Sequence, residues 1–184
     1  MDVGIQHIIG TVALIGLVAS AGFAYTIITS FIDTDVNTER LQQVSEVVAS
    51  NLVEIMNLAK FAKYSDTNMT KNIDVPSDLA GKAYEIQLVN DAGQWIVRSY
   101  LVTNNHVSSD SKIPLSSADV TISLWTEQTV HEMVVGLDQS IIHISGTVYG
   151  GNQIVVWAWP NWNPIDESPS NLKIGIGWIP ANGG

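Results

Sequence analysis

The feature that most constrains this chain is an uncharged stretch near its N-terminal end, which runs from Val3 to Ile32 and contains no Asp, Glu, Lys or Arg. As an α-helix, this stretch would be about 45 Å long at about 1.5 Å per residue. That length exceeds the roughly 20 apolar residues that cross the hydrocarbon core of a bilayer. A chain of 184 residues has little room to bury such a helix in its own core. We therefore expect the helix to be covered by lipid or by copies of itself.

Small residues are spread around this predicted helix. Its glycines recur every six residues, a rotation of about 240° per step, so they form no single stripe. Gly16 and Ser20 form one small-xxx-small pair, the spacing at which helix backbones approach closely. Each glycine weakens a helix by about 1 kcal/mol relative to alanine, which favours a helix with neighbours on several sides over the alternative, a single-pass membrane anchor. The residues expected to pack in such an assembly are Gly4, Gly10, Ala13, Gly16, Ser20, Gly22 and Phe23.

Charge and cysteine content exclude several classes of function. The formal net charge is -10 and the sequence pI is about 4.5, which argues against a nucleic-acid partner. The chain has no cysteine, so it forms no disulfide and no thiolate metal site. No Lys or Arg precedes Arg40, so the basic region of a cleavable secretory signal is not visible. Either the apolar stretch stays in the mature protein, or a basic leader has already been removed.

The helical pattern continues beyond the apolar stretch and becomes amphipathic. The polar run from Asp33 to Asn37 either caps a second helix or is the exit of one long helix into water. Charged and amide side chains then lie mostly off an apolar stripe whose steps are three or four residues, which predicts helix to about Lys63. The stripe consists of Leu41, Val44, Val48, Leu52, Ile55, Ala59 and Ala62.

After this helix the pattern changes to short strands. Residues 65–74 are polar and predict a loop, Pro76 and Gly81 punctuate the next segment, and an alternation of period two begins at Tyr84. Gly175 and Gly177 share one face of the last strand and leave room there for close packing. The predicted strands are 84–88, 95–102, 120–124, 130–137, 141–149, 153–159 and 172–179, with hairpin turns at 90–93 and 150–152.

Together these patterns predict an α+β protein, in which a long hydrophobic N-terminal helix is followed by a small all-β domain. The β-domain is expected to be an Ig-like sandwich or a partly open barrel. The predicted boundaries are 1–64 for the helix, with a hydrophobic half 3–32 and an amphipathic half 36–63, then a linker 65–81 and the β-domain 82–184.

No motif for catalysis or metal binding is present in the sequence. His7, His106, His131 and His143 share no metal-ligand spacing, and His131 is only adjacent to Glu132. The chain contains no phosphate-binding loop and no G-x-S-x-G nucleophile elbow, and its paired carboxylates lie in loop-like contexts. We expect a protein that is not an enzyme and uses no cofactor or metal.

Two surface features remain as candidates. Tryptophans 157, 159 and 162 surround Pro160, and they predict either core filling with an aromatic corner or an exposed patch for subunit contact or adhesion to glycans. Asn68-Met69-Thr70 is an N-glycosylation sequon in a predicted surface loop, which makes Asn68 a candidate glycosylation site if the chain is exported.

This layout resembles the archaeal type IV pilin-like proteins, the superfamily that includes the archaeal flagellins (archaellins). The segment GIQHIIGTVALIGLVASAGFAYTIITSF is similar to their shared helical core. The segment DVPSDLAGKAYEIQLVNDAGQWIVRS, from Asp74 to Ser99, is similar to the start of their β-domains, where a Pro–Gly linker leads into a Y-x-I-x-L strand. The chain departs from the pattern in showing no basic leader with its cleavage site, and in lacking the Glu that bacterial pilins carry near the mature N-terminus.

The resemblance implies the structural subunit of an extracellular helical filament, a homopolymer joined head-to-tail through its N-terminal helices. It also implies storage in the membrane, leader removal by a dedicated peptidase, and assembly by an ATPase and a platform protein. The β-domains would then face outward for adhesion or surface contact. The alternative is a membrane-anchored accessory protein, such as a minor pilin or an archaellum motor or stator component that binds the surface layer.

Overall fold

The computed structural model describes residues 2–61, 68–114, 122–135, 140–162 and 169–180 of the chain. The chain divides into two compact units, residues 1–37 and residues 38–184. A single α-helix, α1 (Asp2–Phe61), begins in the first unit and ends in the second. The polar run at residues 33–37 therefore lies inside one long helix and does not cap a second helix.

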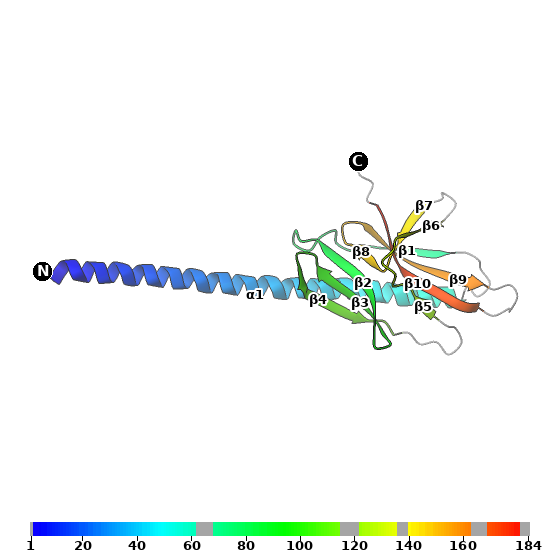
Figure 1. The fold of residues 1–184 in the computed structure, drawn as a ribbon, viewed down its shortest axis with the longest axis horizontal. Helices are drawn as coiled ribbons and strands as arrows, with labels where there is room; N and C mark the ends of the chain where they lie inside the picture. The colour runs from blue at the N-terminus through cyan, green and yellow to red at the C-terminus, as the bar shows by residue number, and fades with distance from the viewer. Residues whose placement is uncertain (1, 62–67, 115–121, 136–139, 163–168, 181–184) are drawn as a thin grey trace. The chain divides into compact units, whose positions relative to one another are not determined.

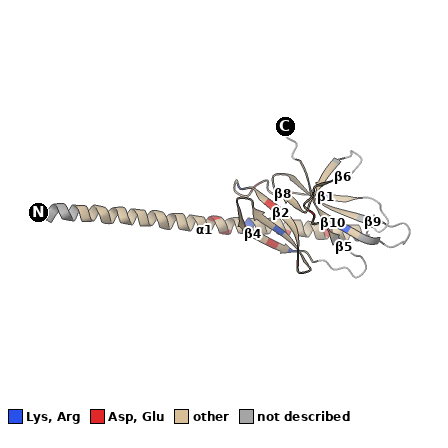
Figure 2. Cartoon of the chain, in the orientation of Figure 1, with Lys and Arg blue, Asp and Glu red and all other residues tan. Residues whose placement is uncertain are grey.

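The first unit is the apolar part of α1. Residues 3–32 contain no Asp, Glu, Lys or Arg, so Figure 2 shows no red or blue along this part of the helix. Three hydroxyl groups on this part, those of Ser20, Thr26 and Thr29, donate to carbonyls of their own helix. Ser20 Oγ donates to Leu17 O at 2.9 Å, and Thr26 Oγ1 donates to Gly22 O at 2.7 Å. Bonds of this kind satisfy side-chain hydroxyls without outside partners, which suits a helix in an apolar environment.

In the second unit, α1 supplies one wall of the core. Every described residue of the predicted apolar stripe is buried, whereas Glu39, Glu46 and Glu54 are exposed. The amphipathic prediction is therefore confirmed for the described residues, since Ala62 lies outside them. The buried stripe consists of Leu41, Val44, Val48, Leu52, Ile55 and Ala59.

The larger sheet has six strands in the order β1-β9-β10-β7-β6, with β5 paired to β10 (Figure 1). The central pair, β9 and β10, is antiparallel over almost its whole length, and among the described strands only the β5–β10 pair is parallel. The strand bounds are β1 Met69–Ile73, β5 Ile122–Leu124, β6 His131–Val135, β7 Ser140–Ile144, β9 Gln153–Trp162 and β10 Pro169–Ile179.

The smaller sheet has four antiparallel strands in the order β4-β3-β2-β8. Its strands are β2 Tyr84–Asp91, β3 Gln94–Leu101, β4 Asn104–Lys112 and β8 Thr147–Tyr149. The β2–β3 hairpin closes through the predicted turn, where Gly93 N donates to Asn90 Oδ1 at 2.9 Å and Ala92 and Gly93 take positive φ angles. Gly93 tolerates the left-handed backbone because it has no Cβ, and Asn90 favours the turn by accepting this hydrogen bond.

One hydrophobic core joins the two sheets and the second part of α1. It contains Leu52 of α1, Ile86 of β2, and Ile154 and Ile174 of the larger sheet, and all four side chains are fully buried. Two sheets that share one core form a sandwich-like arrangement rather than a barrel closed on itself. The fold is thus α+β, with a long N-terminal helix followed by an all-β domain, as the sequence predicts.

Three details of the β-domain differ from the sequence prediction. The loop predicted at 65–74 contains strand β1, and strand β4 was not predicted at all. Both are polar strands at the edge of a sheet, where side chains face water and give little apolar alternation. The hairpin predicted around Gly150 and Gly151 is also wrong, because β8 pairs with β2 in the smaller sheet while β9 belongs to the larger one.

The bare face predicted on the last strand is filled by close packing. A Cβ atom built on Gly175 would lie 2.7 Å from Cζ2 of Trp157, and one built on Gly177 would lie 2.9 Å from the carbonyl oxygen of His143. Trp157 is buried and donates from Nε1 to Ile176 O at 3.0 Å. This face of the larger sheet carries a second apolar cluster, formed by Met133, Ile142, Ile144, Val155 and Trp157.

Candidate functional site

The apolar part of α1 is the largest exposed hydrophobic surface among the described residues. Thirteen large apolar side chains between Ile8 and Ile32 are each 56–72% exposed, and Phe23 is the most exposed of them. The helix is long and apolar enough to cross a membrane, and none of its most apolar window is buried within the chain. Soluble monomers rarely expose apolar patches of more than a few hundred Å², so a surface of this kind requires a partner or a bilayer.

Three glycines of this helix have open space around them, apart from the backbone of the helix itself. A Cβ atom placed on Gly10, Gly16 or Gly22 would meet no atom within 4 Å. In the β-domain, by contrast, Gly150 and Gly175 each have an aromatic ring where a Cβ would stand. Glycine is costly inside a helix, so these helical positions are not explained by packing inside one copy of the chain.

The remaining residues expected to pack in an assembly lie on the same helix. Ala13, Ser20 and Phe23 are exposed, and Ser20 lies one turn after Gly16, as the small-xxx-small spacing requires. Because the Ser20 hydroxyl bonds to its own helix, Ser20 offers small size rather than a free donor. Gly4 belongs to α1, but its surroundings lie outside the described side chains.

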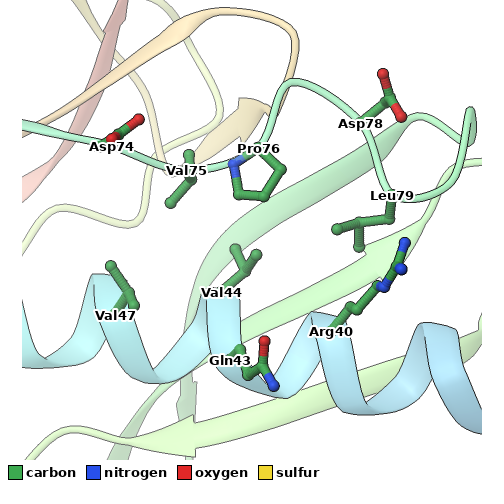
Figure 3. Close-up of a pocket in the computed structure, with 9 residues that line it drawn as sticks. All are labelled: Arg40, Gln43, Val44, Val47, Asp74, Val75, Pro76, Asp78 and Leu79. Atoms are coloured by element: carbon green, nitrogen blue, oxygen red, sulfur yellow. The ribbon is translucent and has the colours of Figure 1, made fainter.

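A groove of about 310 Å³ lies in the second unit between α1 and the segment that precedes β2 (Figure 3). Val44 extends from α1 toward Val75 and Pro76. Leu79 lies on the same segment as these two residues and also faces the helix, whereas the Asp78 carboxylate points away from it. The interior is therefore apolar, and the charged groups lie at its rim. The full lining is Arg40, Gln43, Val44, Val47, Asp74, Val75, Pro76, Asp78 and Leu79.

A second groove, of about 350 Å³, lies on the face of the larger sheet that carries Trp157. We call it the tryptophan groove. Trp125 meets Trp157 edge-on with ring centroids 6.3 Å apart, and it meets the His131 ring at 5.2 Å. Trp157 is buried, whereas Trp159 is 44% exposed, so the groove has both a buried and a solvent-exposed aromatic ring. The lining residues are Asn68, Trp125, His131, Glu132, Met133, Ile144, Trp157 and Trp159.

The tryptophan groove brings together residues that lie far apart in the sequence. Of its three predicted aromatic residues, Trp157 is buried, Trp159 is half-open, and the side chain of Trp162 lies outside the described residues. Asn68 was expected in a surface loop, whereas it directly precedes β1 and lines the groove. Trp125 and Glu132 were not predicted to lie near Trp157, since no local signal indicates that β5 pairs with β10 and that β6 joins the same sheet through β7.

The ion pairs of the domain lie at its surface. The Arg98 guanidinium holds the Asp110 carboxylate through two bonds of 2.8 Å, between β3 and β4. This bidentate bond keeps the pKa of Asp110 below its usual range. Lys71 of β1 pairs with Glu54 of α1 at 2.6 Å. These half-exposed pairs align neighbouring elements but contribute little stability.

Residues that could bind a metal ion do not cluster in the described part of the chain, where no three His, Asp or Glu side chains come together. The described His and carboxylate side chains approach only in pairs: His131 Nε2 lies 3.5 Å from Glu127 Oε2, and His143 Nδ1 lies 3.9 Å from Glu132 Oε1. The His143 ring stacks on Trp178 at 4.4 Å, which accounts for its position by packing.

The comparisons with known proteins found no family model, curated protein or solved structure that matches this chain. The class is thus defined by the structure alone: an α+β protein whose long helix carries an uncovered apolar surface, followed by a β-sandwich-like domain with surface grooves.

Proposed function

We propose that this chain is the structural subunit of an extracellular helical filament of the archaeal type IV pilin-like kind. It would polymerise through the apolar part of α1, with the β-domains facing outward for adhesion or surface contact. The observation that supports this most directly is the surface from Ile8 to Ile32, whose large side chains are exposed and whose glycines have open space around them.

The energetics favour a covered helix. Removing the stretch from lipid would expose on the order of 3,000 Å² of mostly apolar surface, and at about 25 cal/mol per Å² the cost would be tens of kcal/mol. That cost exceeds the whole stability of a typical domain. Neighbouring helices of the same kind would remove it by covering the surface on all sides.

The distribution of small residues favours helices as that cover. Lipid chains adapt to any side-chain shape, so a lipid-covered helix gains nothing from glycine. Neighbouring helices approach closely only at small residues, and Gly10, Gly16 and Gly22 place such positions around the circumference of α1. Contacts made head-to-tail around one axis give an open filament when the rotation does not close.

Before assembly the subunit would be held in the membrane by the same helix. The resemblance to pilin-like proteins adds a leader peptidase, an assembly ATPase and a platform protein as partners. Filament growth would then transfer α1 from lipid to a bundle of identical helices, so the apolar surface would stay covered throughout.

A second candidate is a membrane-anchored accessory β-domain, such as a minor pilin or a motor or stator component that binds the surface layer. It is favoured by the same apolar helix, because α1 near the N-terminus is long enough to span a bilayer once. In this case the glycines would reflect the ordinary composition of membrane helices.

Electron microscopy of material sheared from cells separates the two candidates, together with N-terminal sequencing of its main band. A filament subunit gives long fibres of one polypeptide. An accessory protein stays with the membrane fraction and yields a detergent-bound monomer or dimer with no fibres at high concentration. That second result would refute the filament proposal.

A further inference from the structure

The tryptophan groove contains two buried polar atoms that nothing in the described chain satisfies. Trp125 Nε1 and Asn68 Oδ1 are both buried, and neither has a hydrogen-bond partner among the described residues. A buried donor or acceptor without a partner costs about 1–3 kcal/mol. Here one atom is a donor and the other an acceptor, and both belong to residues that line the same groove.

Aromatic side chains line the same groove as these two residues. Trp125, Trp157 and Trp159 all line the groove, and Trp159 is open to solvent on part of its surface. The face of an aromatic ring carries partial negative charge, so it attracts the weakly positive C–H bonds on the face of a sugar ring. A groove of about 350 Å³ is at the lower end of the range for small-molecule sites.

The polar rim of the groove fits hydroxyl groups. The Glu132 carboxylate and the His131 ring both line it, and Glu132 is largely exposed. An ionised carboxylate only accepts hydrogen bonds, whereas the indole Nε1 only donates them. A ligand that satisfies this set must both donate and accept at several points, and a sugar hydroxyl does both.

A quaternary ammonium ion is the other ligand that aromatic sites commonly bind. The position of Lys173 argues against it, since its Nζ lies 5.9 Å from the ring centroid of Trp125 and 5.7 Å from that of Trp159. These two rings are therefore already paired with a cation, which would repel a second one. A neutral ligand avoids this repulsion.

We propose that the tryptophan groove is a saccharide-binding site that holds one pyranose ring against Trp159, with hydroxyl groups bonded to Trp125 Nε1, Asn68 Oδ1 and Glu132. The ring could come from a free or cell-surface glycan, or from a glycan attached to Asn68 itself, because Asn68-Met69-Thr70 is a sequon. The site goes beyond the filament proposal, since a monomer would bind the sugar as well as a polymer.

The first test uses the full chain made without glycosylation and held in a polyoxyethylene detergent, because alkyl glycosides and phosphocholines would themselves act as probes. Maltose, mannobiose, N,N′-diacetylchitobiose and choline chloride are titrated separately, with saturation-transfer NMR and tryptophan fluorescence as readouts. We expect at least one disaccharide to bind with a Kd of about 1 mM, and choline not to compete with it.

Three variants locate the binding. Trp159→Ala should raise the Kd about tenfold or more, as for other aromatic anchors, and Glu132→Gln should raise it severalfold. Tyr149→Ala is the matched control, since Tyr149 is an exposed aromatic residue on the smaller sheet, and it should leave the Kd within about twofold. Absence of binding by every disaccharide, binding of choline alone, or unchanged affinity in Trp159→Ala would overturn the proposal.

The second test identifies the source of the sugar. The chain is produced in a host that glycosylates N-x-S/T sites, and Asn68 is examined by mass spectrometry of its peptide. Thr70→Ala removes the sequon while leaving the Asn68 amide in place. If the attached glycan fills the groove, added disaccharide binds the Thr70→Ala variant but not the glycosylated chain. If both bind it equally, the groove accepts a separate glycan.

Discussion

The hydroxyl oxygens of Ser45 and Ser99 lie 2.5 Å apart in the core of the second unit, where they join α1 to strand β3. Ser99 Oγ also lies 2.7 Å from the carbonyl oxygen of Leu41, and Ser45 Oγ lies 3.2 Å from that of Ser109. Both serines are fully buried. A buried polar network of this kind sets the register of the helix against the smaller sheet, because each hydroxyl requires its partner.

The contributions of Ser45 and Ser99 to the free energy of unfolding should be coupled. We expect Ser99→Ala to lower the free energy of unfolding by about 1–3 kcal/mol, because Ser45 loses a buried partner. The double variant with Ser45→Ala should cost less than the sum of the two single variants. Urea unfolding followed by tryptophan fluorescence measures all three. Ser50→Ala, at an exposed position of the same helix, is the control, and strict additivity would contradict a coupled pair.

Two adjacent glycines should respond differently to alanine. A Cβ on Gly150 would overlap the ring of Tyr84, whereas a Cβ on Gly151 would meet nothing within 4 Å. We expect Gly150→Ala to destabilise the domain by about 1–3 kcal/mol through overpacking. Gly151→Ala should be neutral within about 0.5 kcal/mol. The midpoints of thermal unfolding compare them directly, and equal midpoints would show that the Tyr84 ring can move aside.

The stability of the domain should fall at alkaline pH through Tyr84. Burial, and to a lesser degree the charge of Asp78, raise the pKa of Tyr84 from 10.0 to about 12. The folded state therefore keeps the proton that the unfolded chain loses near pH 10. The stabilisation that comes from the Tyr84 proton is fully present below pH 10 and is lost as the pH rises to about 12.

The matching variant is Tyr84→Phe, which also removes the hydrogen bond from the Tyr84 hydroxyl to the Pro76 carbonyl. It should lower stability near neutral pH by about 1 kcal/mol and make the alkaline decline shallower. Some decline should remain, because the pKa of Tyr100 is also raised to about 12. Urea unfolding between pH 8 and 12 measures the slope, with Tyr149→Phe as an exposed control. An unchanged slope would contradict the role of Tyr84.

The filament proposal predicts that bulk at a small position blocks assembly. Gly16→Leu and Ser20→Leu should each abolish fibres while leaving membrane insertion intact, since both changes increase hydrophobicity. Val18→Leu adds one carbon at a position that is already large, and it should assemble normally. Membrane fractionation and electron microscopy report the two outcomes separately. Normal fibres from Gly16→Leu would refute the close-packing argument.

The helix and the interior strands could be predicted from sequence because their signals are local. The three-to-four spacing from Leu41 to Ala59 follows from burial on one side of α1, and the alternation from Tyr84 to Leu88 follows from burial on one side of β2. Strands β1 and β4 gave no such signal, because both are polar edge strands with little apolar alternation. The partner of β1, strand β9, is also distant in the chain, whereas β4 follows its partner β3 in a hairpin.

The tryptophan groove could not be predicted from local sequence patterns. It combines Asn68, Trp125 and Glu132 with a strand further along the chain, and only the sheet order brings them together. The turn at Gly150 illustrates the same limit. Its glycines were recognised, but the strands on either side have different partners, and no local spacing reveals which sheet a strand joins.

That turn has a mechanical consequence. Between the end of β7 at Ile144 and the start of β9 at Gln153, the chain leaves the larger sheet, adds β8 to the smaller one and returns. This short segment connects the two sheets, so separating one sheet from the other would also remove a strand from the smaller sheet. Under a pulling force, a β-domain connected in this way should unfold in one cooperative step.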